Sequence, residues 1–181
     1  MGEYIYVASS WRNPWQPTVV ELLRDADLAV YDFRHPAPGD EGFRWTDVDP
    51  EWKAWQPERY REALAHPIAE HGFGLDMDAL ENCTACLLVQ PCGTSSHLEL
   101  GWAVGAGKRT AVLFPTDLEA QPVGGHSVSS APCRACGDLD GCHLPARVRR
   151  VEPELMAKMA DTILIGRREL SEWVAELTNA S

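Results

Sequence analysis

Basic side chains are scarce in this chain. Its 181 residues include 16 lysines and arginines against 27 aspartates and glutamates, which gives a formal net charge of −11. Non-specific binding to nucleic acid or to an anionic membrane takes most of its affinity from Lys and Arg side chains that neutralise phosphates. We therefore expect neither nucleic acid nor a membrane as a partner. A small nucleotide is not excluded, because the N-terminus of one helix can hold a phosphate.

The chain also lacks an apolar run of 18 residues, and its start lacks a basic segment followed by an apolar one. A membrane-spanning helix would need the first of these features and a secretory leader the second. Six cysteines could form three disulfides, but a domain of this size does not need them. We therefore expect a cytoplasmic protein whose cysteines are free thiols or metal ligands.

Hydrophobic residues make up 45% of the chain, enough for one compact domain with a core of its own. Short runs rich in β-forming residues alternate with segments of helical spacing. Strands are predicted at residues 4–8, 28–33, 86–90 and 110–114. Helices are predicted at residues 14–25, 57–65, 76–83, about 95–106, 153–164 and 168–177, with Asp76 capping the helix at 76–83.

Strands that alternate with helices imply right-handed βαβ units and a parallel sheet. No internal repeat and no shift in composition divides the chain. We predict an α/β fold: a single flavodoxin- or Rossmann-like domain over residues 1–181, with a parallel sheet of four to five strands flanked by helices. An irregular loop insert that contains cysteines is expected at about residues 115–150.

Residues 93–101, Gly-Thr-Ser-Ser-His-Leu-Glu-Leu-Gly, form the most informative segment. They follow a buried-type strand and place Glu99 within one turn of a predicted helix start that Ser95 or Ser96 would cap. An acid beside an anion-binding helix end, at the carboxyl edge of a parallel sheet, suits chemistry on a sugar or phosphate. The alternative is a capping box, in which Ser96 caps the helix and Glu99 only folds back onto the cap.

Three motifs follow one another along the chain: a first strand that ends at Ser9-Ser10, the run 76–80 (Asp-Met-Asp-Ala-Leu), and the run 93–108. In this order they resemble the nucleoside 2-deoxyribosyltransferase superfamily, which includes nucleotide N-glycoside hydrolases of similar size. The resemblance covers roughly residues 4–114. Its most specific part is Glu-Leu-Gly-x-Ala-x-x-x-Gly-Lys, which begins at Glu99 and ends at Lys108.

The resemblance implies roles for particular residues. In this family the glutamate of the run is the catalytic nucleophile, which implies that role for Glu99. The acid on the preceding helix helps to position sugar and base and serves proton transfer, which points to Asp76; a plain helix N-cap is its alternative role. The loop after the first strand contacts substrate in the family, which points to Ser9, Ser10 and Tyr6.

One departure from the family concerns the 5′ end of the substrate. The transferases carry an aspartate six residues before the nucleophile, where it binds the sugar 5′-hydroxyl, and this chain has Gly93 there. The loss of that carboxylate favours a 5′-phosphate, which a second anion would repel. Ser95 and Ser96 would then be phosphate ligands or simple caps, and His97 would bond the phosphate or tune Glu99.

Aromatic residues are concentrated in two connections. Trp11 lies on the loop after the first strand and is the better candidate to contact substrate. Trp45, Trp52 and Trp55 lie in the long connection over residues 34–56, where we expect most of them to pack, since such a loop needs apolar anchors of its own.

A cysteine cluster falls in the irregular insert. Cys133, Cys136, Cys142 and His143 have the ligand types of a tetrahedral structural zinc site, and a metal would order a loop that has no core. Loop thiols are the alternative, since the spacing fits no two-pair zinc motif. Cys83 and Cys86 straddle a helix end and a strand start, so at least one is expected in the core.

Two classes of function follow from these residues. The first is an enzyme that cleaves or transfers the N-glycosidic bond of a nucleoside or its 5′-monophosphate through a glutamate nucleophile, with no cofactor for catalysis. The second is a module similar to Toll/interleukin-1 receptor domains that senses nucleotides, or binds or cleaves nucleotides derived from NAD. The transferase and hydrolase families that the chain resembles assemble as dimers or larger oligomers, so a homo-oligomer is expected.

Overall fold

The computed structural model describes residues 2–121 and 155–179. Five strands in this part of the chain form one sheet: β1 (Tyr4–Ala8), β2 (Ala29–Tyr31), β3 (Ala85–Val89), β4 (Arg109–Phe114) and β5 (Thr162–Ile165). The helices are α1 (Gln16–Asp25), α2 (Trp45–Val48), α3 (Pro57–Ala63), α4 (Pro67–Asn82), α5 (Thr94–Gly105) and α6 (Gly166–Asn179), with short 3-10 segments η1 (Trp52–Ala54) and η2 (Leu155–Met159).

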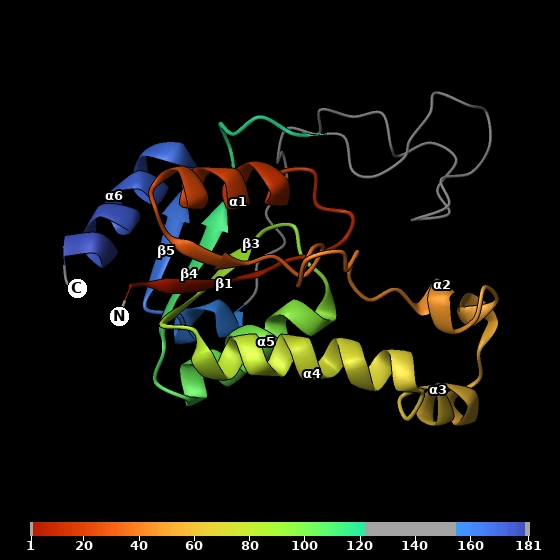
Figure 1. The fold of residues 1–181 in the computed structure, drawn as a ribbon. Helices are drawn as coiled ribbons and strands as arrows, with labels where there is room; N and C mark the ends of the chain where they lie inside the picture. Colours follow the sequence, from red (N-terminus) through yellow and green to blue (C-terminus); the bar gives the residue numbers. More distant parts are fainter. Residues whose placement is uncertain (1, 122–154, 180–181) are drawn as a thin grey trace. The chain divides into compact units, whose positions relative to one another are not determined.

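The sheet has the strand order β2-β1-β3-β4-β5 (Figure 1). β1 runs parallel to β3, β3 to β4 and β4 to β5. The register places Tyr6 beside Cys86 and Cys86 beside Thr110. The predicted α/β architecture with a parallel sheet flanked by helices is therefore confirmed, with five strands.

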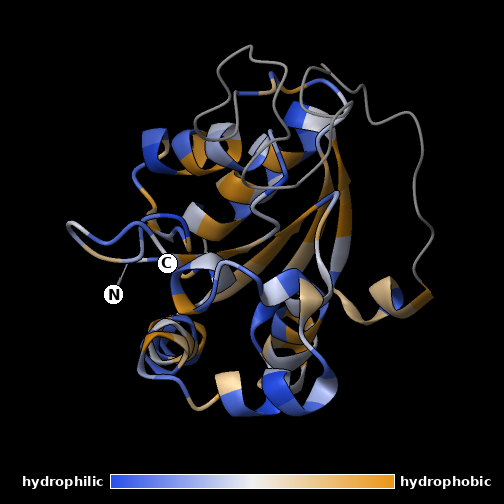
Figure 2. Cartoon of the chain, turned by 90° about the vertical axis from the view of Figure 1, so that its right-hand side faces the viewer, coloured by the Kyte–Doolittle hydropathy of each residue, from blue (hydrophilic) through white to orange (hydrophobic). Residues whose placement is uncertain are grey.

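Each face of the sheet packs against different helices. Alternate residues of β1, β3 and β4, including Ile5, Leu87 and Leu113, pack with α1 and α6 in one hydrophobic core. The helix α5 contacts β1, β3 and β4, and it lies on the opposite side of the sheet from α1 and α6 (Figure 1). Because both faces are covered, the central strands are hydrophobic almost throughout, as Figure 2 shows by their orange colour.

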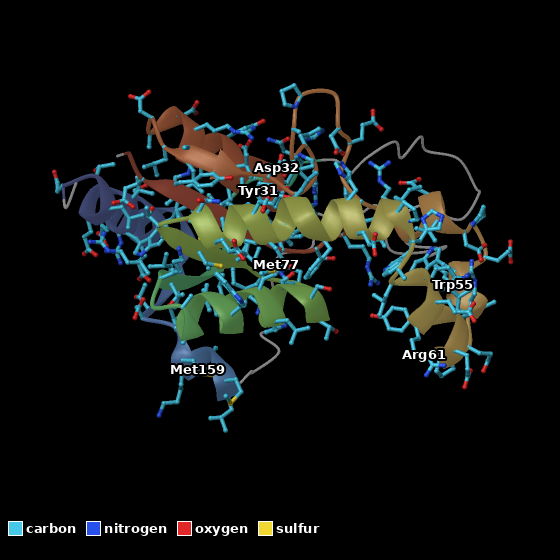
Figure 3. All side chains as sticks on the ribbon, turned by 60° about the horizontal axis from the view of Figure 1, so that its bottom comes forward. Tyr31, Asp32, Trp55, Arg61, Met77 and Met159 are labelled. Atoms are coloured by element: carbon cyan, nitrogen blue, oxygen red, sulfur yellow. The ribbon has the colours of Figure 1, made fainter. Side chains whose placement is uncertain are left out.

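The described chain divides into two compact units. One holds the described parts of residues 1–30 and 83–181, with most of the sheet, α1, α5 and α6, and the other spans residues 31–82. In the second unit Trp45 is the centre of an aromatic cluster, with ring centroids 4.7 Å from Phe43, 5.5 Å from Trp55 and 5.8 Å from Tyr60. Trp55, labelled in Figure 3, also donates its indole N–H to Asp49 at 2.7 Å. Trp45 and Trp55 thus pack, as expected.

The prediction for the start of the helix at 76–83 is wrong. The helix α4 begins at Pro67, so Asp76 lies in its interior and is not its N-cap. Gly72 and Gly74 weaken the helical pattern of the sequence, but Gly72 is needed for packing. A Cβ atom at Gly72 would lie 2.7 Å from the Cβ of Phe43, so only a glycine lets Phe43 approach this helix.

The prediction of a helix at 153–164 is also wrong. The described part of that range holds η2 and then β5, whose residues Thr162 to Ile165 pair with β4. A helical pattern of apolar residues in a short segment is easily overridden when an open sheet edge is available for pairing. Asp161 fixes the start of this strand, because its carboxylate accepts hydrogen bonds from the backbone N–H (2.7 Å) and hydroxyl (3.0 Å) of Thr110.

Within the described residues, no helix combines the length and the apolar character that crossing a membrane requires. The cysteine-containing insert predicted at about residues 115–150 falls mostly outside the described residues, and the single-domain assignment stays a prediction.

Candidate active site

The sheet has a topological switch point between β1 and β3. These neighbouring strands lead to helices on opposite faces, β1 to α1 and β3 to α5. In open parallel sheets of this order, the connections that diverge at the switch point leave a crevice beyond the carboxyl ends of the strands, where ligands bind. Most of the predicted site residues of the first unit belong to the two loops and the helix that begin here.

Asn13 holds the two loops together. Its side chain is fully buried, and its amide nitrogen donates hydrogen bonds to the Ser9 hydroxyl (2.9 Å), the Val89 carbonyl (3.0 Å) and the Pro91 carbonyl (3.1 Å). Its amide oxygen accepts from the backbone N–H of Trp15 at 2.9 Å. The sequence analysis did not assign Asn13 a role. The available signal was an asparagine in the short loop that follows the first strand. Its amide group can donate to and accept from backbone groups of two loops at once.

Ser9 and Ser96 complete this connection. The Ser9 hydroxyl donates to the Val89 carbonyl at 3.0 Å, and the Ser96 hydroxyl donates to the Ser9 carbonyl. The capping box, which was the alternative role for Ser96 and Glu99, is therefore not formed. Gly93 is the N-cap of α5, and Ser96 lies in the first turn with its hydroxyl engaged by the other loop.

The first turn of α5 has no side-chain cap. At Gly93 no side-chain hydrogen bond caps the helix, and Thr94 and Ser95 are exposed. His97 turns back over this end, with Nδ1 3.1 Å from the Gly93 carbonyl oxygen and both ring nitrogens 3.7 Å from the sulfur of Cys92. Thr94 and Ser95 thus lie exposed at the positive end of the helix.

Glu99 lies in the second turn of α5 and is half-buried. Its carboxylate is close enough to β3 to affect the thiol of Cys86. Burial, then the charges of Cys83 and Glu99, raise the pKa of Cys86 well above its usual value. Cys86 pairs in register with Tyr6, which is itself almost fully buried. Glu99 therefore lies on α5, the helix that follows β3 and packs against β1, β3 and β4.

The remaining predicted residues of the first loop are more open. Ser10 and Trp11 are both partly exposed, and the Ser10 hydroxyl accepts from the backbone N–H of Arg12 at 3.2 Å. Trp11 lies in the turn that follows. Both residues are thus in partial contact with solvent, whereas Ser9, Asn13 and Ser96 make hydrogen bonds within the protein.

Asp76 belongs to the second unit, where it pairs with Tyr31. The Tyr31 hydroxyl donates a hydrogen bond of 2.7 Å to Asp76 Oδ1. Burial raises the pKa of Asp76, and the hydrogen bond from Tyr31 opposes that rise. A raised pKa favours the protonated form of the carboxyl group relative to an exposed aspartate. The sequence did not reveal Tyr31 as the hydrogen-bond partner of Asp76, because 45 positions separate the two residues.

A second buried acid, Asp32, follows Tyr31; both are labelled in Figure 3. Asp32 accepts from the backbone N–H of Arg34 at 3.1 Å and lies 3.2 Å from Nδ1 of His35. Burial lowers the pKa of Arg34 to about 10, against the attraction of Asp32. These contacts fix the turn after β2, and Asp32 has the role of an anchor for that turn.

No group of three or more metal-binding side chains lies close together in the described parts of the chain. The zinc ligands predicted at Cys133, Cys136, Cys142 and His143 lie outside those residues, so that site stays a prediction. Cys83 and Cys86 are both buried free thiols, which confirms the expectation that at least one lies in the core. Burial raises the pKa of Cys83, although Lys108 opposes the change.

No protein family and no curated protein matches the sequence. Among solved structures, the fold is similar to that of the CMP N-glycosidase BcmB from Clostridium botulinum, with a TM-score of 0.42 and 12% sequence identity over 97% of this chain and 98% of that chain.

Proposed function

We propose that this chain cleaves or transfers the N-glycosidic bond of a nucleoside or nucleoside 5′-monophosphate, with Glu99 as the nucleophile. The observation that carries the proposal is the position of Glu99: a half-buried acid on the helix that leaves the β1–β3 switch point. The Glu-Leu-Gly-x-Ala-x-x-x-Gly-Lys run that begins at Glu99 supports the same assignment from the sequence.

The chemistry requires a fixed carboxylate. As the bond between the anomeric carbon and the base breaks, positive charge develops on the sugar, and a carboxylate below the ring stabilises it. An oxygen of Glu99 then bonds to the anomeric carbon, and the electron pair of the broken bond leaves with the base. Water or a second base later attacks the same carbon, which releases Glu99 and gives hydrolysis or transfer.

The leaving base needs a proton or a strong hydrogen bond. We assign this role to Asp76, because the family resemblance points to the acid on this helix; burial, which raises the pKa of its carboxyl group, is in keeping with the role. Tyr31 orients the group through its hydrogen bond to Oδ1, which leaves the other carboxyl oxygen to carry the proton. General acid assistance of this kind is worth about 10²–10⁴ in rate.

The 5′ end of the substrate is assigned to the first turn of α5. Gly93 brings no carboxylate to this end of the helix, while Thr94 and Ser95 leave hydroxyls exposed there. Backbone N–H groups and hydroxyls at a helix N-terminus bind phosphate well. A 5′-monophosphate is therefore the preferred form, and a free nucleoside should be the poorer substrate.

The test is base release from a panel of nucleosides and nucleoside 5′-monophosphates, measured by chromatography with and without a second base. Glu99→Gln should lower release by about 10³-fold or more, because the amide oxygen is a weak nucleophile. Glu176→Gln is the matched control: it removes the same charge from an exposed position on α6 and should keep full activity.

Two outcomes would contradict the proposal. Equal base release by the parent and Glu99→Gln would exclude the nucleophile. Thermal stabilisation of the parent by a nucleotide, with no base released from any member of the panel, would favour the nucleotide-sensing alternative. If the proposal holds, Glu99→Gln should still be stabilised by the substrate, since it keeps the fold and the phosphate contacts.

A further inference from the structure

The carboxyl group of Asp76 is held by a single hydroxyl. The Tyr31 hydroxyl donates to Oδ1 at 2.7 Å, and it is the one hydrogen-bond partner of this carboxyl group among the described residues. Tyr31 is the last residue of β2 and is buried, whereas Asp76 lies in the interior of α4. Both belong to the second unit. One oxygen of the acid is thus fixed, and the other keeps its hydrogen-bonding capacity within the described part of the chain.

The burial of Asp76 is not offset by a cation from the described residues. Burial has the larger effect on the pKa of this acid and raises it, while the hydrogen bond from Tyr31 lowers it. Acids that are buried for structural reasons are normally paired with a cation or bound by several donors. Aspartate is also a poor residue for a helix interior. Stability alone therefore does not account for an acid at this position.

Two other acids of this unit are bound as structural acids usually are. Asp49 accepts from the indole N–H of Trp55 at 2.7 Å and from the backbone N–H of Glu51 at 2.9 Å, and these bonds lower its pKa. Asp32 accepts from the backbone N–H of Arg34 in its own turn. Both carboxylates thus hold the local backbone in place. The acid on α4 bonds no backbone group of the described chain, so its hydrogen bond serves the acid itself.

Other charged groups near α4 do not account for the raised pKa of Asp76, whose two causes are burial and the Tyr31 hydroxyl. On α4 itself, the positions one helical turn away cannot titrate: Gly72, Phe73, Ala79 and Leu80. The helix α2 contacts α4, and its ionisable residue, Asp47, is exposed. In the connection before α2, Asp40 pairs with His71 at 3.3 Å. The state of Asp76 thus depends on its burial and on one tyrosine.

The hydrogen bond from Tyr31 acts mainly on the charged form of the acid. In the proposed reaction the proton moves from Oδ2 of Asp76 to the leaving base, the electron pair of the broken N-glycosidic bond stays with the base, and Asp76 becomes a carboxylate. A hydroxyl bonds a carboxylate more strongly than it bonds the neutral acid. Tyr31 therefore stabilises the charge that develops as the proton leaves, and it makes Asp76 a stronger acid than burial alone would allow.

We propose that Tyr31 is a positioning residue of the reaction: its hydroxyl holds Oδ1 of Asp76, directs the acid proton to Oδ2 and sets the pH range over which that proton reaches the base. The inference rests on the proposed function, in which Asp76 is the general acid. Tyr31 acts through Asp76 and needs no contact with the substrate. Its removal should therefore change the pH dependence and the rate of base release more than the binding of the substrate.

The pH profile of base release by Tyr31→Phe tests the proposal. A general acid acts while it is protonated, so release falls as pH rises through the pKa of Asp76. Without the hydroxyl that pKa should rise, and the fall in release should move to higher pH by about one pH unit or more. Below the fall, kcat should decrease about three- to tenfold because the acid is weaker, with KM unchanged. A loss of packing alone would not move the pH of the fall.

NMR follows the titration of Asp76 without any reaction. The carboxyl carbon signal, assigned with Asp76→Asn, should titrate at higher pH in Tyr31→Phe than in the parent. In the parent itself, the Cζ signal of Tyr31 should change with the same midpoint as Asp76, which tests the pair even if Tyr31→Phe fails to fold. Tyr60→Phe is the matched control, because it removes the same hydroxyl from an exposed ring on α3 in the same unit. It should leave the pH profile and the Asp76 titration unchanged.

The two measurements separate this proposal from the proposed function. Base release with the same pH profile in the parent and in Tyr31→Phe would overturn the role of Tyr31 and leave the proposed function standing. An Asp76 signal that titrates alike in both, or an equal shift in Tyr60→Phe, would also overturn it. If the parent releases no base from any nucleotide, the proposed function fails, whereas a shifted Asp76 titration in Tyr31→Phe would still support the control of this acid by Tyr31.

Discussion

Asn13 is the residue whose removal should most clearly weaken the candidate active site without touching its chemistry. Its amide group bonds the loop after β1 to the loop after β3, and its side chain is inaccessible to water. In Asn13→Ala the buried Val89 carbonyl and the part-buried Pro91 carbonyl each lose a donor, and the backbone N–H of Trp15 loses its acceptor.

The size of the effect follows from these contacts. A buried polar group left without its partner costs about 1–3 kcal/mol. The Ser9 hydroxyl and the Val89 and Pro91 carbonyls share the two N–H bonds of one amide, and each carbonyl keeps a second lone pair. The costs of the separate hydrogen bonds therefore do not simply add up. We expect Asn13→Ala to lower the free energy of unfolding by about 2–4 kcal/mol. In a chain of this length that loss corresponds to a fall in Tm of roughly 4–16 °C.

Urea unfolding followed by circular dichroism measures the change. Arg12→Ala is the control in the same loop, because Arg12 is exposed; it should stay within about 0.5 kcal/mol of the parent. If Asn13→Ala also unfolds within about 0.5 kcal/mol of the parent, the Asn13 contacts do not hold the two loops together, and the reasoning is refuted.

Three further predictions follow. Burial raises the pKa of Asp76 in the folded chain, so the contribution of this group to stability is present in acid and falls as pH rises through that pKa. Asp76→Asn should therefore resist urea better than the parent at neutral pH and lose that advantage in acid. The same variant should release less base than the parent. Ser96→Ala removes one of the hydrogen bonds that join the two loops and should lower the free energy of unfolding by about 1 kcal/mol, measured by urea titration. Gly166→Ala should lower Tm, because Gly166 has a φ of 75° and a Cβ there would lie 2.5 Å from Oδ1 of Asp117, whereas Gly74→Ala, with open space on α4, should keep or raise it.

The strands β1, β3 and β4 were predicted to within one or two residues. Each is a short run of β-forming or apolar residues bounded by breakers, and burial on both faces leaves such a run little choice of structure. The segment at 162–165 differs, because Thr162 to Ile165 become a strand only by pairing with β4. That pairing joins residues some 50 positions apart and has no signature within the segment.

The same division holds for the site. Glu99 could be singled out from the sequence, since its motif and its place after a buried strand are local features. The partner of Asp76 could not, because Tyr31 reaches it from another strand end. Ser96 looked like a cap by its position, yet its hydroxyl bonds the Ser9 carbonyl, and that choice depends on two loops meeting at the switch point.

The sequence by itself determined the alternation of strands and helices, the parallel α/β class, and the glutamate that the proposed chemistry needs, because periodicity, breakers and short motifs are encoded by near neighbours. Only the tertiary structure decided that β1 and β3 are adjacent, that Asn13 joins their loops, and that burial raises the pKa of Asp76. Each of these depends on residues brought together from distant positions, and burial and hydrogen bonding take effect only once those residues meet.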